Sequence, residues 1–515
     1  MTAAERNINA PIPADTQTVA SLLSYWEENT PDAPFLLFLD DDDVITTLDF
    51  AAAADLSRRG SAVLSDLGVH RGDRFAVVVD NCPEFFACWF AAARIGAIMV
   101  PVSPQSSVDD LDYVFTHALC RAVICGARQE LVVRAASRAG QAVAVVGADY
   151  ENRSHGPVPE LDEEVDPQDP LAVLYTSGTT SRPKGVVVTH AAYLAAGYVV
   201  ARHVRLRAGD RWLISLPLFH ANAQYYCAMS ALTAGASVAV TNRFSASRWP
   251  AQAERLGATL ASLFAAPIRM ILARTNGEIR GKRLRATLFA QNLSDREIAE
   301  FETRFGCALI QIYGMTETVV PPLMNPLYGH RENMTLGLPT PAVRLRIVDS
   351  EGEDVSPGEV GELLVGGEPG LTLMSGYLHD PIATITALRG GWLHTGDLVR
   401  ALPNGFVAFH DRVKDMIKRS GENVAAAEVE WVLNQHVAVF ESAVVGVPDP
   451  IRDEAIKAVV VLRDDADIDA ADLARHCAGL LPRHKLPDYF EFVDSLPRTS
   501  VGKVKKHLLR DSFNS

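Results

Sequence analysis

The fold is decided by one stretch, Leu174-Tyr175-Thr176-Ser177-Gly178-Thr179-Thr180-Ser181-Arg182-Pro183-Lys184-Gly185, in which an apolar strand leads into a loop of hydroxyls and glycines. Hydroxyl side chains, free backbone N–H groups and one lysine suit a polyphosphate. The spacing is not that of a Walker loop, in which Gly-Lys is followed at once by Ser or Thr. A loop of this composition alone is typical of a mobile surface linker, but the strand before it and the Pro-Lys-Gly at its end favour a phosphate-binding loop. The candidate residues are Thr176, Ser177, Gly178, Thr179, Thr180 and Lys184.

Around this loop, short apolar runs alternate with helical patterns over roughly the first four hundred residues. The expected strands are 75–79, 98–102, 122–124, 142–146, 171–175, 212–216, 238–241, 284–289 and 309–312, with a helix over 83–94. Strands that alternate with helices indicate βαβ units, so we expect an α/β fold of mixed, mainly parallel sheets. The run Asp40 to Asp43 predicts a solvated hairpin turn between two apolar runs.

The pattern of apolar runs and turn residues changes after about residue 340. Strands at 343–348, 360–365 and 406–409, separated by Gly, Pro and Asp turns, predict a small β subdomain. From Lys414 onward, a helix near Ala425 and strands at 443–447, 458–462 and 490–493 predict a small α+β domain. We therefore expect an N-terminal domain over residues 1–412 and a C-terminal domain over residues 413–515, joined by a short hinge.

Composition narrows the function classes. The 515 residues are 48 % hydrophobic and 22 % charged, which is typical of a globular protein. The net charge of −15 repels nucleic acid and anionic membranes in general, so neither is expected as a partner. The seven widely spaced cysteines include no Cys-x-x-Cys pair, and the polar N-terminus resembles no signal peptide, so we expect a cytoplasmic protein.

A second motif, Gln311-Ile312-Tyr313-Gly314-Met315-Thr316-Glu317-Thr318, also follows an expected strand. Tyr313 could lie against a purine, and Thr316 could reach a phosphate. Glu317 offers one carboxylate for Mg²⁺, which typically uses one or two carboxylates together with substrate phosphates and waters. In isolation, the same residues would equally suit a solvated helix start.

Two further motifs lie closer to the C-terminus. In Gly391-Trp392-Leu393-His394-Thr395-Gly396-Asp397, the carboxylate of Asp397 could take both ribose hydroxyls, and Arg412 could pair with ribose or phosphate. Pro497-Arg498-Thr499-Ser500-Val501-Gly502-Lys503 places one lysine in a polar tail. Alone, the first is a common turn and the second a frayed basic terminus.

Together the four motifs resemble the adenylate-forming superfamily of acyl-CoA synthetases, nonribosomal adenylation domains and luciferases. The resemblance spans nearly the whole chain, in the family's order and spacing. The stretches 289–305, 416–430 and 451–457 are most similar to the crotonobetaine/carnitine–CoA ligase branch.

The resemblance implies a role for each matching residue. It implies that the loop of Thr176 to Lys184 holds the β- and γ-phosphates, that Lys503 meets the acid and the α-phosphate, and that Lys414 is the hinge. It further implies a mobile C-terminal domain that delivers Lys503 for adenylation and then rotates to open a path for a thiol. The remaining implied nucleotide residues are Gln291, Gln311, Tyr313, Gly314, Thr316, Asp397, Arg412 and Lys418; the implied magnesium ligands are Thr176 and Glu317; the implied CoA contacts are Ser420 and Gly421.

The acyl pocket departs from the family pattern. Many relatives carry Gly-Gly-Ala-Pro where this chain has Ala290-Gln291-Asn292-Leu293, and bulkier polar side chains should narrow or polarise the pocket. Ser420 also replaces a glycine common in close relatives. The expected acyl-side residues are His220, Asn222, Gln224, Tyr225, Ala265 and Gln291, with His220 also a candidate catalytic residue beside Lys503 and Glu317.

The resemblance therefore implies a ligase that uses ATP and Mg²⁺ to adenylate a small polar or aryl carboxylic acid and passes the acyl group to CoA. One alternative keeps adenylation but changes the acceptor: nitrite would be activated for an aryl amine, as in a diazotase, or a carrier-protein thiol would be loaded. Another is a nucleotide-binding protein without catalysis, which the intact Glu317, Asp397, Arg412 and Lys503 disfavour.

Overall fold

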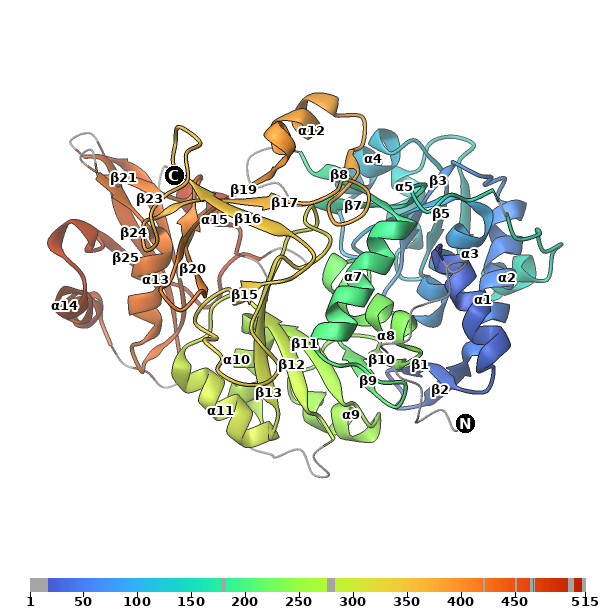
Figure 1. Ribbon diagram of the computed structural model, residues 1–515, viewed down its shortest axis with the longest axis horizontal. Coiled ribbons are helices and arrows are strands. Elements are labelled where there is room, and N and C mark those ends of the chain that lie inside the picture. The colour runs from blue at the N-terminus through green and yellow to red at the C-terminus, as the bar shows by residue number, and fades with distance from the viewer. Residues whose placement is uncertain are drawn as a thin grey trace.

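The computed structural model describes residues 17–162, 164–176, 182–275, 283–419, 422–449, 452–463, 466, 468–498 and 504–511. Within these residues the strands form four sheets, and the C-terminal strands and helices gather at one end of the molecule (Figure 1). The predicted α/β architecture, with a β subdomain and a separate C-terminal sheet, is confirmed.

The first sheet has nine strands in the order β15-β14-β13-β12-β11-β9-β10-β1-β2. Its bounds are β1 Pro34–Leu39, β2 Ile45–Asp49, β9 Arg211–Ile214, β10 Ser237–Thr241, β11 Leu260–Phe264, β12 Ala286–Ala290, β13 Ala308–Tyr313, β14 Leu323–Met324 and β15 Leu338–Pro339. Strands β9 to β13 pair in parallel, as their helical connections require, whereas β1 and β2 form an antiparallel hairpin over the expected Asp40–Asp43 turn.

The second sheet has seven strands in the order β18-β8-β7-β4-β3-β5-β6. Its bounds are β3 Arg74–Val78, β4 Ile98–Pro101, β5 Cys120–Cys125, β6 Ala142–Val145, β7 Pro170–Thr176, β8 Lys184–Thr189 and β18 Gly376–Tyr377. Strands β3 to β7 are parallel, but β7 and β8 are antiparallel, so the hydroxyl-rich loop closes a hairpin.

Two smaller sheets complete the chain, and both are antiparallel except that β25 pairs with β24 in parallel. The β subdomain contains β16 Arg344–Val348, β17 Gly361–Gly366, β19 Leu393–Ala401 and β20 Val407–Arg412. The C-terminal sheet contains β21 Ile417–Arg419, β22 Glu422–Val424, β23 Val439–Asp449, β24 Asp453–Leu462 and β25 Tyr489–Phe492.

The described helices accompany all of these sheets. They are α1 Val19–Asn29, α2 Phe50–Asp66, α3 Pro83–Ile95, α4 Val108–His117, α5 Glu130–Ala136, α6 Ala148–Ser154, α7 His190–His203, the π-helix Asn222–Ala228, α8 Met229–Ala234, α9 Trp249–Arg255, α10 Ala265–Arg274, α11 Asp295–Phe305, α12 Pro381–Ala387, α13 Ala426–Asn434, α14 Ala470–Leu480 and α15 Lys506–Asp511; short 3₁₀ turns lie at Arg389–Gly391 and Arg483–Lys485. Helices α13, α14 and α15 pack against the C-terminal strands. Alternation along β3 shows how the layers form: Phe75 and Val77 face the central core, and Ala76 and Val78 face the outer core under α4 and α5.

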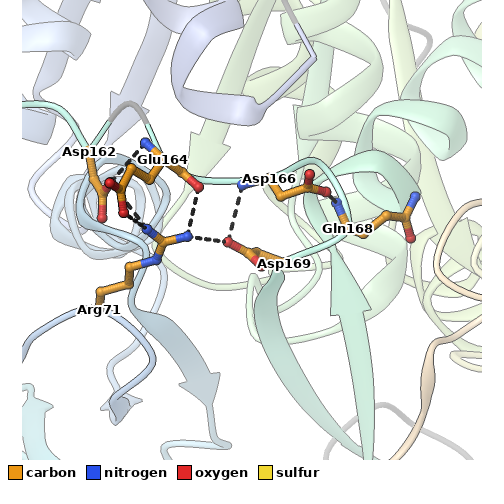
Figure 2. A network of polar contacts seen from close by, with 6 residues as sticks. All are labelled: Arg71, Asp162, Glu164, Asp166, Gln168 and Asp169. Atoms are coloured by element: carbon orange, nitrogen blue, oxygen red, sulfur yellow. Dashed lines mark hydrogen bonds and ion pairs between the residues drawn. The ribbon is translucent and has the colours of Figure 1, made fainter.

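The segment that leads into β7 is fastened by Arg71, as Figure 2 shows. The Arg71 guanidinium donates to the carbonyl of Glu164 at 2.7 Å and to Asp169 Oδ2 at 3.1 Å. Asp169 in turn accepts from the backbone N–H of Asp166 at 3.1 Å. This network sets the direction in which the chain enters β7, the strand that ends at the hydroxyl-rich loop.

Candidate active site

The site residues come from strand ends in three sheets. In parallel sheets, ligands bind beyond the carboxyl ends of the strands. His220 follows β9, Ala265 follows β11, Gln291 follows β12, and Tyr313 ends β13, all at that edge of the first sheet. Side-chain contacts connect this edge to the second sheet and to the β subdomain.

The first connection is the cluster Tyr313–Asp397–Arg412. The hydroxyl of Tyr313 donates to Asp397 Oδ2 at 2.6 Å, and Arg412 Nε pairs with Asp397 Oδ1 at 2.9 Å. Asp397 is 1 % exposed, so these two partners replace the hydrogen bonds that water would make to its carboxylate. Burial and the neighbouring Asp397 charge raise the pKa of Tyr313, which keeps its hydroxyl a donor. Each carboxylate oxygen can accept a further hydrogen bond, as a vicinal diol would require.

Gln311 shares a strand face with Tyr313, because residues i and i+2 point to the same side. It is 2 % exposed, and its backbone N–H donates to Asn333 Oδ1 at 3.1 Å. Its buried side-chain oxygen has no hydrogen-bond partner among the described residues. A buried amide with spare capacity beside Tyr313 suits the predicted contact with a purine.

The second connection is made by Glu317. Glu317 is 6 % exposed, and its carboxylate accepts from the Tyr377 hydroxyl at 2.9 Å. Its backbone carbonyl accepts from the N–H of Met374 at 2.9 Å. The Nζ of Lys184 lies 4.8 Å from the centroid of the Tyr377 ring, so Tyr377 lies between the end of the hydroxyl-rich loop and Glu317.

The donor set can be tested for magnesium. No group of three or more His, Cys, Asp or Glu that could hold a metal unaided is present in the part of the chain that the structure describes. One buried carboxylate and one threonine hydroxyl match the few protein ligands that Mg²⁺ uses when phosphates and waters complete its shell. Glu317 and Thr176 therefore fit a magnesium ion that arrives with a polyphosphate.

The hydroxyl-rich loop is described only at its ends. Thr176 lies opposite Lys184 in the β7–β8 register. Helix α4 supports the far end, because the Tyr113 hydroxyl donates to the carbonyl of Pro183 at 2.8 Å. Among the predicted loop residues, those outside the described residues are Ser177, Gly178, Thr179 and Thr180.

The π-helix packs directly against the second motif. A Cβ on Gly314 would lie 2.5 Å from the Tyr226 hydroxyl, so only glycine fits there without displacement. The Tyr225 hydroxyl donates to the carbonyl of Thr316 at 3.4 Å. The hydroxyl of Thr318 accepts from the N–H of Met315 at 2.9 Å and braces the same turn. π-Helical turns frequently occur at functional sites, and this one positions the loop that carries Glu317.

On the acyl side, polar residues of the π-helix are locked in place. Gln224 is fully buried; its Oε1 accepts from the Tyr193 hydroxyl at 2.6 Å, and its Nε2 donates to the carbonyl of Leu218 at 2.8 Å. Asn222 Oδ1 accepts from Ser262 at 2.8 Å. This geometry favours a positioning role for Gln224 rather than the predicted contact with substrate.

Gln291 adopts the left-handed backbone region with φ of 76°, which a residue with a side chain seldom adopts. It is half-buried, whereas Asn292 is exposed and its carbonyl accepts from Arg269 at 2.7 Å. Of the two polar side chains expected to narrow the pocket, only Gln291 is partly buried. His220 is half-buried, with its ring centroid 4.4 Å from that of Phe219.

The hinge and tail are partly described. Lys414 and Lys418 are exposed on the segment after β20. Ser420, Gly421 and Lys503 lie outside the described residues. Arg498, the second residue of the Lys503 motif, forms an isolated antiparallel bridge with Val504, which directly follows the motif.

Sequence reasoning missed Tyr226 and Tyr377. Tyr226 belongs to a π-helix, which has no periodic signature, and Tyr377 sits on a two-residue strand. For Tyr377, the sequence signal that could have indicated a site residue was the Gly376-Tyr377 pair, in which a glycine precedes a tyrosine.

The chain is similar to known proteins over most of its length. The AMP-binding enzyme family matches residues 23–378, and the AMP-binding enzyme C-terminal domain matches residues 428–503. A crotonobetaine/carnitine–CoA ligase of Salmonella arizonae is 34 % identical over 469 residues, covering 88 % of this chain and 91 % of that protein. One of Escherichia coli O139:H28 is 35 % identical over 465 residues, covering 86 % and 89 %.

Solved structures agree with these matches. ATP-bound MatB from Rhodopseudomonas palustris has a TM-score of 0.87 at 27 % identity, covering 96 % of this chain and 99 % of its own. A benzoate CoA ligase from Burkholderia xenovorans LB400 has a TM-score of 0.87 at 26 % identity, with the same coverage. No helix in the described ranges is long and apolar enough to cross a membrane. The predicted resemblance is confirmed: the chain belongs to the AMP-binding enzyme family of the adenylate-forming superfamily and is an ATP-dependent, acyl-CoA-synthetase-like ligase.

Proposed function

We propose that this enzyme uses ATP and Mg²⁺ to adenylate a small polar or aryl carboxylic acid and transfers the acyl group to CoA. The observation that carries the proposal is the Tyr313–Asp397–Arg412 cluster, in which Asp397 is buried. It offers a carboxylate for a ribose diol on the same side of β13 as Gln311, and the next turn presents Glu317.

The first half-reaction joins two anions. A carboxylate oxygen of the acid attacks the α-phosphorus of ATP, the bond to the bridging oxygen breaks, and pyrophosphate leaves with that electron pair. Asp397 and Arg412 hold the ribose, and the loop from Thr176 to Lys184 holds the departing phosphates. Lys503 neutralises charge that develops on the α-phosphate, and a magnesium ion bound at Glu317 and Thr176 would supply further charge stabilisation.

The second half-reaction replaces adenylate with a thiol. The CoA sulfur attacks the carbonyl of the mixed anhydride, the thioester forms, and AMP leaves. We place the division between the two rigid parts at residues 412 and 413, with Lys414 in the hinge and Lys418, Ser420 and Gly421 near the thiol. In the described arrangement the tail helix α15 is tied to the hinge, since Arg510 pairs with Asp415 at 3.2 Å.

The class of acid follows from the polar acyl side. Half-buried Gln291 stands where many relatives have glycine, and Asn222 and His220 lie on the neighbouring strand connections. Such a lining disfavours long alkyl chains, which need an extended apolar surface. Two of the similar solved structures are a benzoate CoA ligase and an o-succinylbenzoate CoA synthetase. Their names support a small aryl acid as the substrate of this enzyme.

The test is pyrophosphate release from ATP and Mg²⁺ with a panel of short, polar, aryl and long-chain acids, followed by thioester formation with CoA. We expect release with a small polar or aryl acid and a thioester with the same acid. A parallel arm offers nitrite with aryl amines, and another offers a carrier-protein thiol. Release that requires nitrite, or acyl transfer only to a carrier protein, would replace CoA ligation with that alternative.

A further inference from the structure

Tyr377 lies between the phosphate loop, which ends at Lys184, and the turn that carries Glu317. Both bind the nucleotide in the proposed function. Tyr377 ends β18, which pairs antiparallel with β8 and places this residue opposite Val186. The next residue, Leu378, donates its N–H to the carbonyl of Gly185 at 2.8 Å. Three residues before Tyr377, Met374 donates its N–H to the carbonyl of Glu317 at 2.9 Å. One short segment therefore holds both the end of the phosphate loop and the turn that carries Glu317.

The side chain of Tyr377 also contacts both the phosphate loop and Glu317. The Tyr377 hydroxyl donates to Glu317 Oε1 at 2.9 Å, and the ring faces the Lys184 ammonium at 4.8 Å from its centroid. The backbone of Tyr377 is itself fixed, because its N–H donates to the Thr384 hydroxyl at 2.8 Å. A hydrogen bond to one carboxylate oxygen sets the plane of the carboxylate and leaves the other oxygen to bind a cation.

The Tyr377 side chain contacts both neighbours at once, because its hydroxyl donates to Glu317 while its ring faces Lys184. A ring beneath an ammonium group attracts it without neutralising it, which leaves the Lys184 charge available to a phosphate.

We propose that Tyr377 is the positioning residue that orients the Glu317 carboxylate toward the metal–nucleotide complex and holds Lys184 of the phosphate loop beside it. The proposal rests on the proposed function, because it needs a metal–nucleotide complex at Glu317. Tyr377 acts through Glu317 and Lys184 and has no role of its own in the chemical steps.

The test measures metal binding without turnover. Mn²⁺ is titrated, by electron paramagnetic resonance, into the full chain with a non-hydrolysable α,β-methylene ATP analogue. Tyr377→Phe keeps the ring and removes the hydroxyl, and we expect the apparent Mn²⁺ affinity to fall about 10–100-fold. Tyr377→Leu also removes the ring, and we expect a further loss of about two- to fivefold in nucleotide affinity. The matched control is Tyr150→Phe, which removes another buried tyrosine hydroxyl on α6 and should bind like wild type.

The possible results distinguish a failure of the Tyr377 proposal from a failure of the proposed function. If the wild-type chain binds no Mn²⁺–nucleotide complex, the metal site of the proposed function is wrong, and the positioning role of Tyr377 is then wrong as well. If wild type binds the complex and Tyr377→Phe binds it equally well, Tyr377 has no positioning role although the proposed function stands. A Tyr377→Phe defect in pyrophosphate release that high Mg²⁺ relieves would support the inference a second time, since a purely structural lesion would not respond to metal.

Discussion

The contact between Gly314 and Tyr226 gives the sharpest test of how the site is assembled. In Gly314→Ala, the new Cβ would lie 2.5 Å from the Tyr226 hydroxyl oxygen, where real contacts begin near 3.0 Å, so something must move by about 0.5 Å. Tyr226 is 6 % exposed within the π-helix and has little room to retreat. Overpacking of this kind costs about 1–3 kcal/mol.

The displaced group is the turn that carries Tyr313 on one side and Glu317 on the other. A shift of half an ångström there should loosen the ribose and metal contacts together, and we expect the KM for ATP to rise about tenfold, roughly 1.4 kcal/mol. Steady-state pyrophosphate release against ATP concentration measures this, and urea unfolding measures the stability cost. Gly209→Ala is the matched control, because its Cβ would meet no atom within 4 Å.

A second substitution decides whether the cause is steric. Tyr226→Phe removes the offending oxygen, and the nearest remaining atoms would be Thr318 Oγ1 at 3.3 Å and the ring carbon of residue 226 at 3.6 Å. The double variant Gly314→Ala with Tyr226→Phe should therefore recover most of the ATP affinity. Wild-type kinetics in Gly314→Ala, or no recovery in the double variant, would refute the packing of the π-helix against this turn.

Three further predictions address the remaining parts. Lys503→Ala should slow pyrophosphate release roughly 10²–10³-fold, the effect of losing one transition-state donor, and a rate within about threefold of wild type would remove Lys503 from the mechanism. Asp397→Asn should raise the KM for ATP about 10–100-fold, since a hydrogen bond to a charged group contributes about 1.5–3 kcal/mol; an unchanged KM would contradict the ribose assignment. Burial lowers the pKa of His190 from 6.5 to about 4, so the unfolded state takes up the proton first as pH falls. This histidine should then lower the unfolding free energy by up to about 3 kcal/mol between pH 6.5 and pH 4; His190→Gln should remove this part of the slope, and an identical slope in the variant would count against it.

Much of the fold could be predicted from local pattern. Apolar runs such as 75–79 and 122–124 became β3 and β5 because strands buried on both faces are apolar at every position. The four-Asp run became a hairpin turn because charged residues stay solvated between two pairing strands. The expected strand at 360–365 begins one residue later, at Gly361, a shift typical of strand ends.

The site could be predicted only in part. Motifs that each follow a strand, such as those of Tyr313 and Asp397, were found because their residue types carry the chemistry. Their hydrogen bond joins residues 84 positions apart, and no local pattern specifies such a contact. Tyr377 was not predicted for the same reason, because its contacts with Glu317 and Lys184 are made in space and not with its neighbours along the chain. The left-handed backbone of Gln291 was likewise hidden, although the glycine common at this place in relatives was a signal for it.

Asp397 and Glu317 are proposed to bind the ribose and the metal–phosphate part of one ATP molecule, within reach of Lys503. A crystal structure of the full chain with Mg²⁺ and α,β-methylene ATP tests this most directly. We expect the ribose hydroxyls on Asp397 and a magnesium ion between Glu317 and the phosphates. A nucleotide bound elsewhere, or one that contacts neither carboxylate, would overturn this assignment.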